Sequence, residues 1–299
     1  MVDTRFTAFN RVLEAREQAQ LARELDTAES LIMQGEYEHA SELLRARADD
    51  AESYVAANCS TTPTDQWFCF SSFADKLAYQ RCEHDERQLH DSEEPLCRLY
   101  NDLALAWAYL DEKELFREAL KQVIRWNPMD CQARLSVADV YRILGNIDEF
   151  AALSVSVIER ASDVRHLASA YTNMALYLRA QNNMDAASAA MHAAKMLDAH
   201  NSQVDALLHE VADSELDADR FTDDEARDLL QAQGVPYGAN ANVVICLLMN
   251  AYEFAKQQHT NEATKLLVRA THLVGQQMVM QLYAEIRAQG EAGDVAAGR

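Results

Sequence analysis

The residue types best suited to bind a metal ion gather in the segment between positions 69 and 97. They are Cys69, Cys82, His84, His90 and Cys97. Structural zinc sites use thiolates and imidazoles in close pairs such as Cys-x-x-Cys, with a second pair further along the chain. Here only Cys82 and His84 are close, and on a helix their side chains point in different directions. We therefore expect no metal site and interpret these cysteines as thiols packed like small apolar side chains.

Acid–base chemistry is the second possibility, because three histidines lie within a short stretch of the sequence. They are His192, His200 and His209, and no nucleophile or carboxylate stands beside them at catalytic spacing. The chain also has no Gly-x-Ser-x-Gly, no His-Glu-x-x-His and no glycine-rich phosphate-binding loop. The run from Asp223 to Glu225 is explained by favourable negative charge at a helix N-terminus. We expect a protein that is not an enzyme, has no catalytic residues and binds no cofactor.

The composition points to an all-helical chain that is strongly acidic. Only 8 glycines and 4 prolines occur among 299 residues, and 49% of the residues are apolar. Scarce helix breakers and abundant helix formers favour an all-α fold. The net charge is −21, and such a chain repels phosphate backbones and anionic lipid head groups. We expect no nucleic-acid and no membrane partner, while a basic partner and simple solubility both remain open as explanations of the charge.

The expected location is the cytoplasm. The first residues, MVDTRFTAFNRVLEAREQ, are polar and amphipathic and lack the apolar core of a secretion signal. No window approaches the roughly 20 consecutive apolar residues that a membrane helix needs. The six cysteines show no paired spacing, which in a chain of this size is typical of reduced thiols.

One pattern of large and small residues occurs three times between positions 97 and 200. The helices that it predicts must hold any functional side chain in place. The copies begin at Tyr100, Arg134 and Tyr171, so they are 34 and 37 residues apart. They read Tyr100, Ala104, Trp107, Phe116, Leu120 and Val123; then Arg134, Ala138, Tyr141, Gly145, Phe150 and Val157; then Tyr171, Ala175, Leu178, Ala187, Met191 and Ala194. The pattern predicts two packed helices per copy. Because one pair cannot bury its apolar face alone, the pairs must stack.

Turn-forming residues mark the expected ends of these helices. Pro128 ends the first copy, since proline cannot continue a helix. Gly145 and Asn182 lie at the turns inside the second and third copies, where a left-handed backbone is needed. Gly35 has the same place in a weaker copy near the N-terminus. Thr222 is the predicted N-cap of a later helix, with Glu225 completing a capping box.

The best copy, YNDLALAWAYLDEKELFREALKQVIRWNP, resembles the tetratricopeptide repeat (TPR), a helix-turn-helix unit of 34 residues. It keeps the small residue of the first helix, the small and bulky core of the second and the closing proline. The resemblance covers residues 97–200, is fainter at 21–48 and 243–274, and is absent between them. Segments such as IRWNPMD and LLQAQGVPYG further resemble a group of bacterial TPR proteins. The resemblance assigns no activity, since function depends on the site and not on the scaffold.

The resemblance implies an all-α, TPR-like α-solenoid of antiparallel helix pairs with a C-terminal capping helix. The expected segments are 1–57, N-terminal helices with a degenerate TPR-like pair; 58–96, an irregular aromatic segment and a helix; 97–200, three TPR units; 201–242, helices of another kind and a loop; 243–290, a C-terminal TPR-like pair and its cap; and 291–299, a disordered tail. Two arrangements of residues 201–242 stay open. In one they continue the solenoid core, and in the other an acidic linker at 212–224 joins two separate bodies.

TPR proteins generally place the first helix of each pair along a concave groove. The resemblance therefore implies a partner-binding groove lined by Arg98, Asn101, Leu105, Tyr109, Asp139, Arg142, Thr172, Asn173, Leu176 and Arg179. Its three arginines would suit bidentate contacts to carboxylates. They would instead be neutralised if they paired with neighbouring acids such as Asp102 and Asp139, and both interpretations stay open. Some TPR domains clamp a C-terminal carboxylate with basic residues, and those residues are missing here.

Two functions follow from this reasoning. The first is a non-enzymatic interaction module that binds a peptide or protein segment in the groove. The alternative is a regulatory sensor whose curvature changes when it binds a peptide. The sequence leaves the oligomeric state open. We favour a cap for the last helix pair as the role of the apolar stripe of the last helix, from Val279 to Ile286, because solenoids need end caps, and a self-association face is the alternative.

Overall fold

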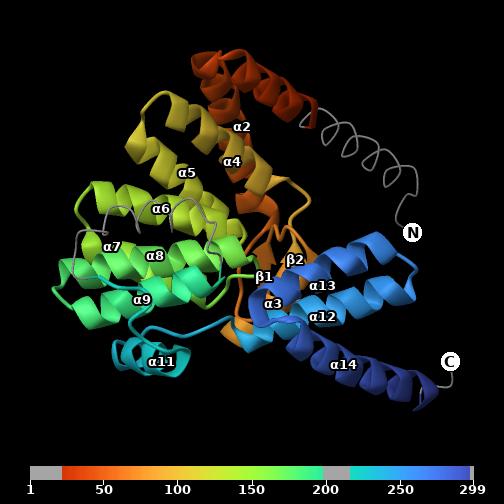
Figure 1. The fold of residues 1–299 in the computed structure, drawn as a ribbon. Coiled ribbons are helices and arrows are strands. Elements are labelled where there is room, and N and C mark those ends of the chain that lie inside the picture. The colour runs from red at the N-terminus through yellow and green to blue at the C-terminus, as the bar shows by residue number, and fades with distance from the viewer. Residues whose placement is uncertain (1–21, 198–215, 297–299) are drawn as a thin grey trace. The chain divides into compact units, whose positions relative to one another are not determined.

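The computed structural model describes residues 22–197 and 216–296 of the chain. The protein is all-α, with a single pair of short strands in these two ranges (Figure 1). The elements are helical residues 22–34, α2 (Tyr37–Asn58), β1 (Asp65–Phe68), α3 (Phe73–Glu83), β2 (Gln88–Asp91), α4 (Leu96–Tyr109), α5 (Lys113–Trp126), α6 (Cys131–Ile143), α7 (Ile147–Ile158), α8 (Val164–Ala180), α9 (Met184–Leu197), α11 (Asp223–Ala232), α12 (Ala241–Lys256), α13 (Thr260–Val274) and α14 (Gln276–Ala296). None of the helices in these ranges is both long and apolar enough to cross a membrane.

The chain divides into two compact units. Unit 1 consists of Met1–Ser71 and Glu86–Pro128, and unit 2 of Ser72–Asp85 and Met129–Arg299. Unit 2 therefore takes α3 from the N-terminal half of the chain. The division falls inside the stretch of three repeats that the sequence predicts, directly after the first copy, and not at residues 212–224.

Unit 1 is built from two helix pairs that pack on each other. The first pair is residues 22–34 with α2, and the second is α4 with α5. Contact between the pairs runs from α2 to α4. Apolar side chains of these four helices are buried, and they include Leu25, Leu44, Leu99 and Leu103. The second helix of one pair thus packs on the first helix of the next, which is the contact that stacked helix pairs need.

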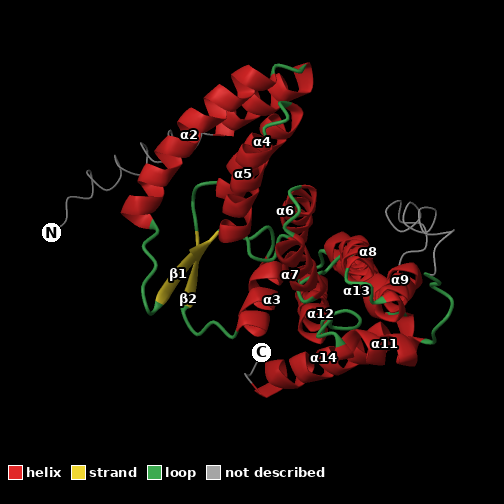
Figure 2. Ribbon diagram, turned by 90° about the vertical axis from the view of Figure 1, so that its left-hand side faces the viewer, coloured by secondary structure: helices red, strands yellow, loops and turns green. Residues whose placement is uncertain are grey.

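A small parallel sheet stands where the sequence predicts an irregular segment. β1 and β2 pair in parallel, with Trp67 opposite His90, and the centroids of these two rings lie 4.7 Å apart. The backbone N–H of Cys69 donates to the carbonyl oxygen of Trp126 at 2.7 Å, which attaches the end of β1 to the end of α5. Figure 2 shows the two strands side by side near that end of α5.

The aromatic run that accompanies this sheet is less buried than its composition predicts. Phe68 is buried at the end of β1, whereas Phe73 at the start of α3 is 61% exposed. The helix expected within residues 58–96 is α3. It ends at Glu83, because the next residue, His84, has a left-handed backbone with a φ of 50°, and β2 follows. β2 therefore forms between α3 and α4, and no local sequence pattern predicts it.

The helix pairs of both units share one turn conformation. Five pairs in the described part of the chain have a residue with positive φ at the turn: Gly35, Asp111, Gly145, Asn182 and Gln258. In each, the N–H of the next residue donates to the carbonyl oxygen five positions earlier, at 2.9–3.0 Å. This is the hydrogen-bond pattern of a Schellman motif, which satisfies the last carbonyl groups of the first helix. The turns predicted at Gly35, Gly145 and Asn182 are confirmed.

Unit 2 joins the remaining pairs around one core. α6 pairs with α7 and α8 with α9, and α7 packs on α8. α12 pairs with α13, and α3 packs against α12. Figure 1 shows α8 beside α9 and α12 beside α13. The buried core includes Val157, Tyr171, Met191 and Leu247, each with 2% of its surface exposed or less.

α11 confirms the capping box that the sequence predicts. The backbone N–H of Thr222 donates to Glu225 Oε2 at 2.9 Å, and the N–H of Glu225 donates to Thr222 Oγ1 at 3.4 Å. The helix packs on α9, and its fully buried Leu230 belongs to the same core as Met191 and Leu247. The apolar stripe expected at residues 204–211 lies outside the described residues.

α14 packs against both α12 and α13 and buries Val279. Leu282, Tyr283 and Ile286 also pack on the core, so this stripe covers the last helix pair within the same chain. The helix continues to Ala296, beyond position 291, where the sequence predicts the start of a disordered tail.

Candidate functional site

The groove residues that the TPR resemblance implies are divided between the two units. Arg98, Asn101, Leu105 and Tyr109 lie on α4 of unit 1. Arg98 Nε donates to Glu29 at 2.8 Å and its Nη2 to Asp26 at 2.6 Å, so two carboxylates already neutralise its charge. Tyr109 stacks on Tyr37 with ring centroids 4.4 Å apart. Leu105 and Asn101 are exposed.

The other six groove residues belong to unit 2, on α6 and α8. Arg142 forms an ion pair with Asp139 one turn earlier, with 3.7 Å between Nε and Oδ1. Thr172 and Asn173 are buried, and the hydroxyl of Thr172 donates to the carbonyl oxygen of Ala168 at 3.0 Å. Leu176 packs against the core and Arg179 is half-buried. Neither buried residue presents its side chain to a partner, so the implied groove is incomplete within unit 2.

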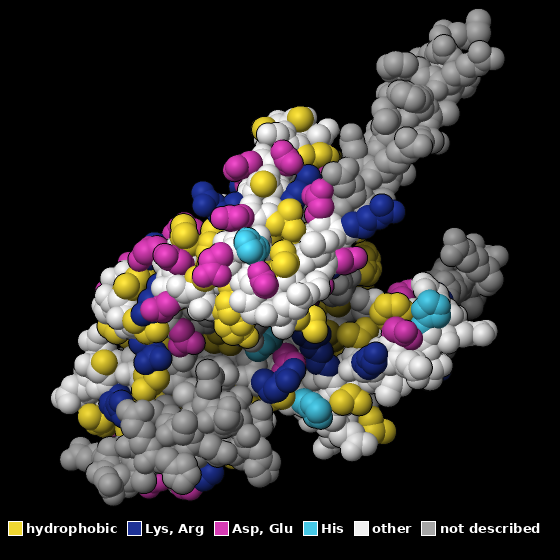
Figure 3. Space-filling view, turned by 90° about the horizontal axis from the view of Figure 1, so that it is seen from above, with side chains coloured by type: hydrophobic (Ala, Val, Ile, Leu, Met, Phe, Trp, Pro, Cys, Tyr) yellow, Lys and Arg dark blue, Asp and Glu magenta, His cyan; other side chains and the backbone are white. Residues whose placement is uncertain are grey.

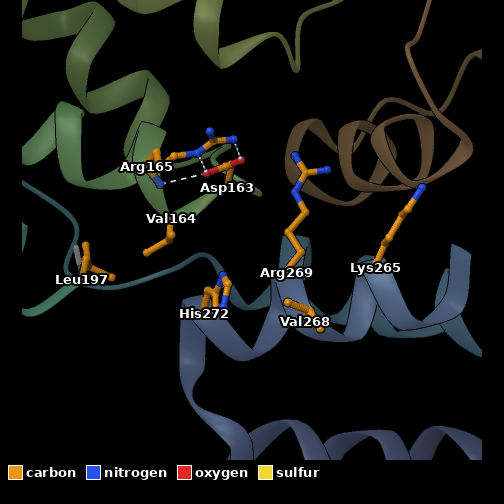
Figure 4. Close-up of a pocket in the computed structure, with 8 residues that line it drawn as sticks. All are labelled: Asp163, Val164, Arg165, Leu197, Lys265, Val268, Arg269 and His272. Atoms are coloured by element: carbon orange, nitrogen blue, oxygen red, sulfur yellow. Dashed lines mark hydrogen bonds and ion pairs between the residues drawn. The ribbon is translucent and has the colours of Figure 1, made fainter. Parts of the chain in front are cut away.

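A basic pocket in unit 2 is a better site. It has a volume of about 910 Å³ and lies between the start of α8, the end of α9 and α13. Figure 4 shows its lining, which consists of Asp163, Val164, Arg165, Leu197, Lys265, Val268, Arg269 and His272. Three permanent cations and one histidine thus face a single carboxylate, in a chain whose net charge is −21.

The first wall of the basic pocket is set by the N-terminus of α8. Asp163 is the N-cap of this helix, and its Oδ1 accepts the backbone N–H of Arg165 at 2.9 Å. The Arg165 guanidinium donates to both oxygens of the same carboxylate, at 3.1 and 2.8 Å. These contacts, above all the side-chain hydrogen bonds from Arg165, lower the pKa of Asp163 to about 2. The carboxylate is therefore ionised at neutral pH and neutralises Arg165.

The opposite wall is one face of α13. Lys265, Arg269 and His272 are spaced by four and three residues, which places them on the same side of the helix. Figure 4 shows the Lys265 and Arg269 side chains rising from successive turns in the same direction. Within the described part of the chain, Lys265 makes no hydrogen bond or ion pair, and it is exposed.

Arg269 is held in place before any ligand arrives. Its Nε donates to the carbonyl oxygen of Ser162 and its Nη2 to the Ser162 hydroxyl, which ties α13 to the turn before α8. Asp75 of α3 is close enough for the charge of Arg269 to act on its carboxyl group. Burial nonetheless raises the pKa of Asp75, and the hydrogen bond from Ser72 opposes this increase more than Arg269 does. Arg269 is thus a fixed cation with no direct carboxylate partner among the described residues.

The chemistry available in the basic pocket is recognition of negative charge. Lys265 and Arg269 supply donors, while Val164, Val268 and Leu197 supply apolar surface beside them. Figure 3 shows one face of the molecule, on which both acidic and basic side chains lie. The pocket therefore carries an excess of positive charge, although the chain as a whole is negative, and it should attract an anionic group.

Two of the histidines singled out in the sequence, His90 and His192, make hydrogen bonds inside their own units. His192 bridges α9 and α11, with Nδ1 2.9 Å from the Ala218 carbonyl oxygen and Nε2 2.8 Å from Asp223 Oδ1. His200 and His209 lie outside the described residues. His90 Nε2 lies 2.7 Å from Asp65 Oδ1, and no described group of three or more potential ligands is arranged to hold a metal ion.

Sequence reasoning missed the basic pocket because its walls come from residues about a hundred positions apart. The spacing of Lys265, Arg269 and His272 was a visible signal of one charged helix face. Nothing in the sequence indicated that Asp163 and Arg165 would lie opposite this face. No family model matches the chain, and no curated protein matches it.

Proposed function

We propose that the protein is a non-enzymatic, TPR-like interaction module and that the basic pocket of unit 2 binds an acidic segment of a partner protein. The observation that carries this proposal is the excess of positive charge in a cavity of about 910 Å³ on a chain of net charge −21. The shared turn of the helix pairs and the packing of second helix on first helix support the TPR-like part.

Charge explains why the partner segment is acidic. Carboxylates accept hydrogen bonds from guanidinium and ammonium groups, and such bonds are about twice as strong as those between neutral groups. Arg269 is already oriented by Ser162, so little side-chain freedom is lost when a ligand binds it. The acidic remainder of the surface repels a partner segment that is negative over a wide area. A short acidic motif flanked by apolar residues therefore fits best.

The pocket is a stronger candidate than the implied groove on α4, α6 and α8. Arg98 and Arg142 already face carboxylates in their own units. Thr172 and Asn173 are buried. In contrast, Lys265 is exposed and makes no ion pair within the described residues, so no internal contact must break before it binds a carboxylate.

Two charge reversals decide between the sites, because each changes the net charge equally. Fluorescence polarisation would measure binding of a labelled peptide rich in Asp and Glu, with its Asn/Gln counterpart as the uncharged control. Lys265→Glu should weaken acidic-peptide binding about tenfold or more, since a charge-assisted contact becomes a repulsion. Arg142→Glu on α6 should leave it unchanged.

Each other outcome has a definite meaning. Loss of binding in Arg142→Glu with retention in Lys265→Glu would move the binding site to the groove. Equal affinity of wild type for the acidic and the uncharged peptide would reject recognition of negative charge. Circular dichroism of both variants checks that the fold is intact, which is expected because both positions are exposed.

A further inference from the structure

We propose that Cys69 and Cys97 of unit 1 form a dithiol site that hydrogen peroxide oxidises to a disulfide, with Cys69 as the thiol that attacks the peroxide and Cys97 as the resolving thiol. Both cysteines are reduced and half-buried. The site lies in unit 1, whereas the basic pocket lies in unit 2. The inference therefore stands independently of the proposed function.

The two thiols are brought together by the junction of β1, α4 and α5. Cys69 follows β1, and its backbone is fixed by the hydrogen bond to Trp126. Cys97 lies in the first turn of α4, where its thiol donates to the Cys69 carbonyl oxygen at 3.2 Å. The Cys97 sulfur is thus in contact with residue Cys69 before any reaction takes place.

The N-terminus of α4 stabilises the thiolate form of Cys69. The N-cap of α4 is Pro95, which makes no side-chain capping hydrogen bond. The Leu96 N–H donates to the Glu94 carbonyl oxygen at 2.8 Å, and the backbone N–H groups of Cys97 and Leu96 at this end of the helix favour the thiolate of Cys69. Together with the Cys97 thiol, which has the largest effect, they lower the pKa of Cys69 to about 6, although burial and Asp91 oppose this.

The other cysteines for which a pKa shift is resolved show the opposite behaviour. Burial raises the pKa of Cys59, Cys82, Cys131 and Cys246. A thiol held in its protonated form reacts slowly with peroxide, because the thiolate is the nucleophile. Of these five cysteines, Cys69 is therefore the one whose thiolate is favoured.

The chemistry balances with peroxide as the only oxidant. The Cys69 thiolate attacks one oxygen of hydrogen peroxide, so an S–O bond forms and the O–O bond breaks. The departing hydroxide takes up the proton that the Cys69 thiol had released and becomes water. The Cys97 sulfur then attacks the Cys69 sulfur of this sulfenic acid, the S–O bond breaks, and the hydroxyl group leaves with the Cys97 proton as a second water. Two thiols and one peroxide yield one disulfide and two waters.

Peptide mass spectrometry of the reduced full-length protein, treated with hydrogen peroxide and then alkylated, tests the proposal. The expected product is a peptide pair joined through Cys69 and Cys97. In Cys97→Ser, where no resolving thiol remains, dimedone should label Cys69. Cys131→Ser is the matched control and should form the disulfide as wild type does, because Cys131 is buried.

A second measurement does not depend on any variant. Alkylation of wild type by iodoacetamide, followed for each cysteine against pH, should show a midpoint near 6 for Cys69 and no comparable reaction at the buried cysteines. A Cys69 midpoint in the ordinary thiol range would overturn the proposal. So would a peroxide-treated protein without the Cys69–Cys97 bond, or dimedone labelling spread evenly over the cysteines.

Discussion

At the scale of single residues, Asp163 has two structural roles, and their contribution to stability can be measured without any ligand. It caps α8 and holds Arg165 beside the basic pocket. Asp163→Ala should lower the free energy of unfolding by about 1–2 kcal/mol at pH 7, because one backbone N–H loses its cap and Arg165 its partner. Urea unfolding at several pH values measures this.

The pH dependence of that loss follows from the lowered pKa of Asp163. The group binds its proton less readily in the folded state than in the unfolded state, so its stabilising effect is fully present above the unfolded pKa of about 3.9. The effect is lost as the pH falls towards about 2. The difference in the free energy of unfolding between wild type and Asp163→Ala should therefore become smaller below pH 4. A difference that stays constant from pH 7 to pH 3 would contradict this explanation.

The second prediction at the scale of single residues concerns the hydroxyl group of Tyr171. Its ring is fully buried, while its hydroxyl donates to the Pro236 carbonyl oxygen at 2.8 Å and accepts the Gly238 N–H at 2.7 Å. Tyr171→Phe leaves both backbone groups unpaired and should cost about 1–3 kcal/mol in chemical unfolding. Tyr177→Phe on the same helix is the control, since no hydroxyl hydrogen bond of Tyr177 occurs in the described part of the chain. Equal effects of the two substitutions would rule out the hydrogen bonds as the cause.

At the scale of elements, the shared turn conformation of the helix pairs predicts that two substitutions change the stability of the protein in different directions. Gly145 has a φ of +78° with no atoms within 4 Å of an added Cβ, so Gly145→Ala should destabilise by about 1 kcal/mol through backbone strain alone. Gln258 occupies the same place in the last pair with a φ of 63°, so Gln258→Gly should be neutral or stabilising. Thermal unfolding compares the two, and a loss of stability in both would show that side-chain contacts dominate these turns.

The elements also show how far sequence reasoning reached. Gly35, Gly145 and Asn182 could be predicted as turn positions because their residue types favour a left-handed backbone. Asp111 and Gln258 adopt the same conformation, and there the flanking helices, which the local sequence does not describe, set the backbone.

The small sheet and the pockets were beyond such reasoning for a related reason. β1 and β2 are separated in the sequence by α3, which belongs to unit 2. Strands of only four residues are also too short to show a reliable pattern of alternating side chains. Likewise the sequence places Cys69 and Cys97 in one segment but predicts no contact between them, since nothing in it indicates that β1 ends beside the start of α4.

At the scale of the whole molecule, unit 2 depends on a segment that lies far from it in the sequence. α3 packs against α12, buries Ala74 in the core and pairs Glu83 with Arg160. A fragment from Met129 to Arg299 lacks this helix, so apolar surface of α12 becomes exposed to water. It should unfold at lower denaturant concentration than the full chain and bind the dye ANS, which detects exposed apolar surface.

Restoring α3 distinguishes this explanation from a general effect of truncation. Residues 72–85 fused by a flexible linker to the start of the fragment should recover cooperative unfolding and abolish dye binding, because only the covalent path to the helix has changed. The same fusion carrying Ala74→Asp should fail, since it places an unpaired charge in the core. If the bare fragment were as stable as the fused one, α3 would contribute nothing to unit 2, and the boundary of that unit would lie at Met129.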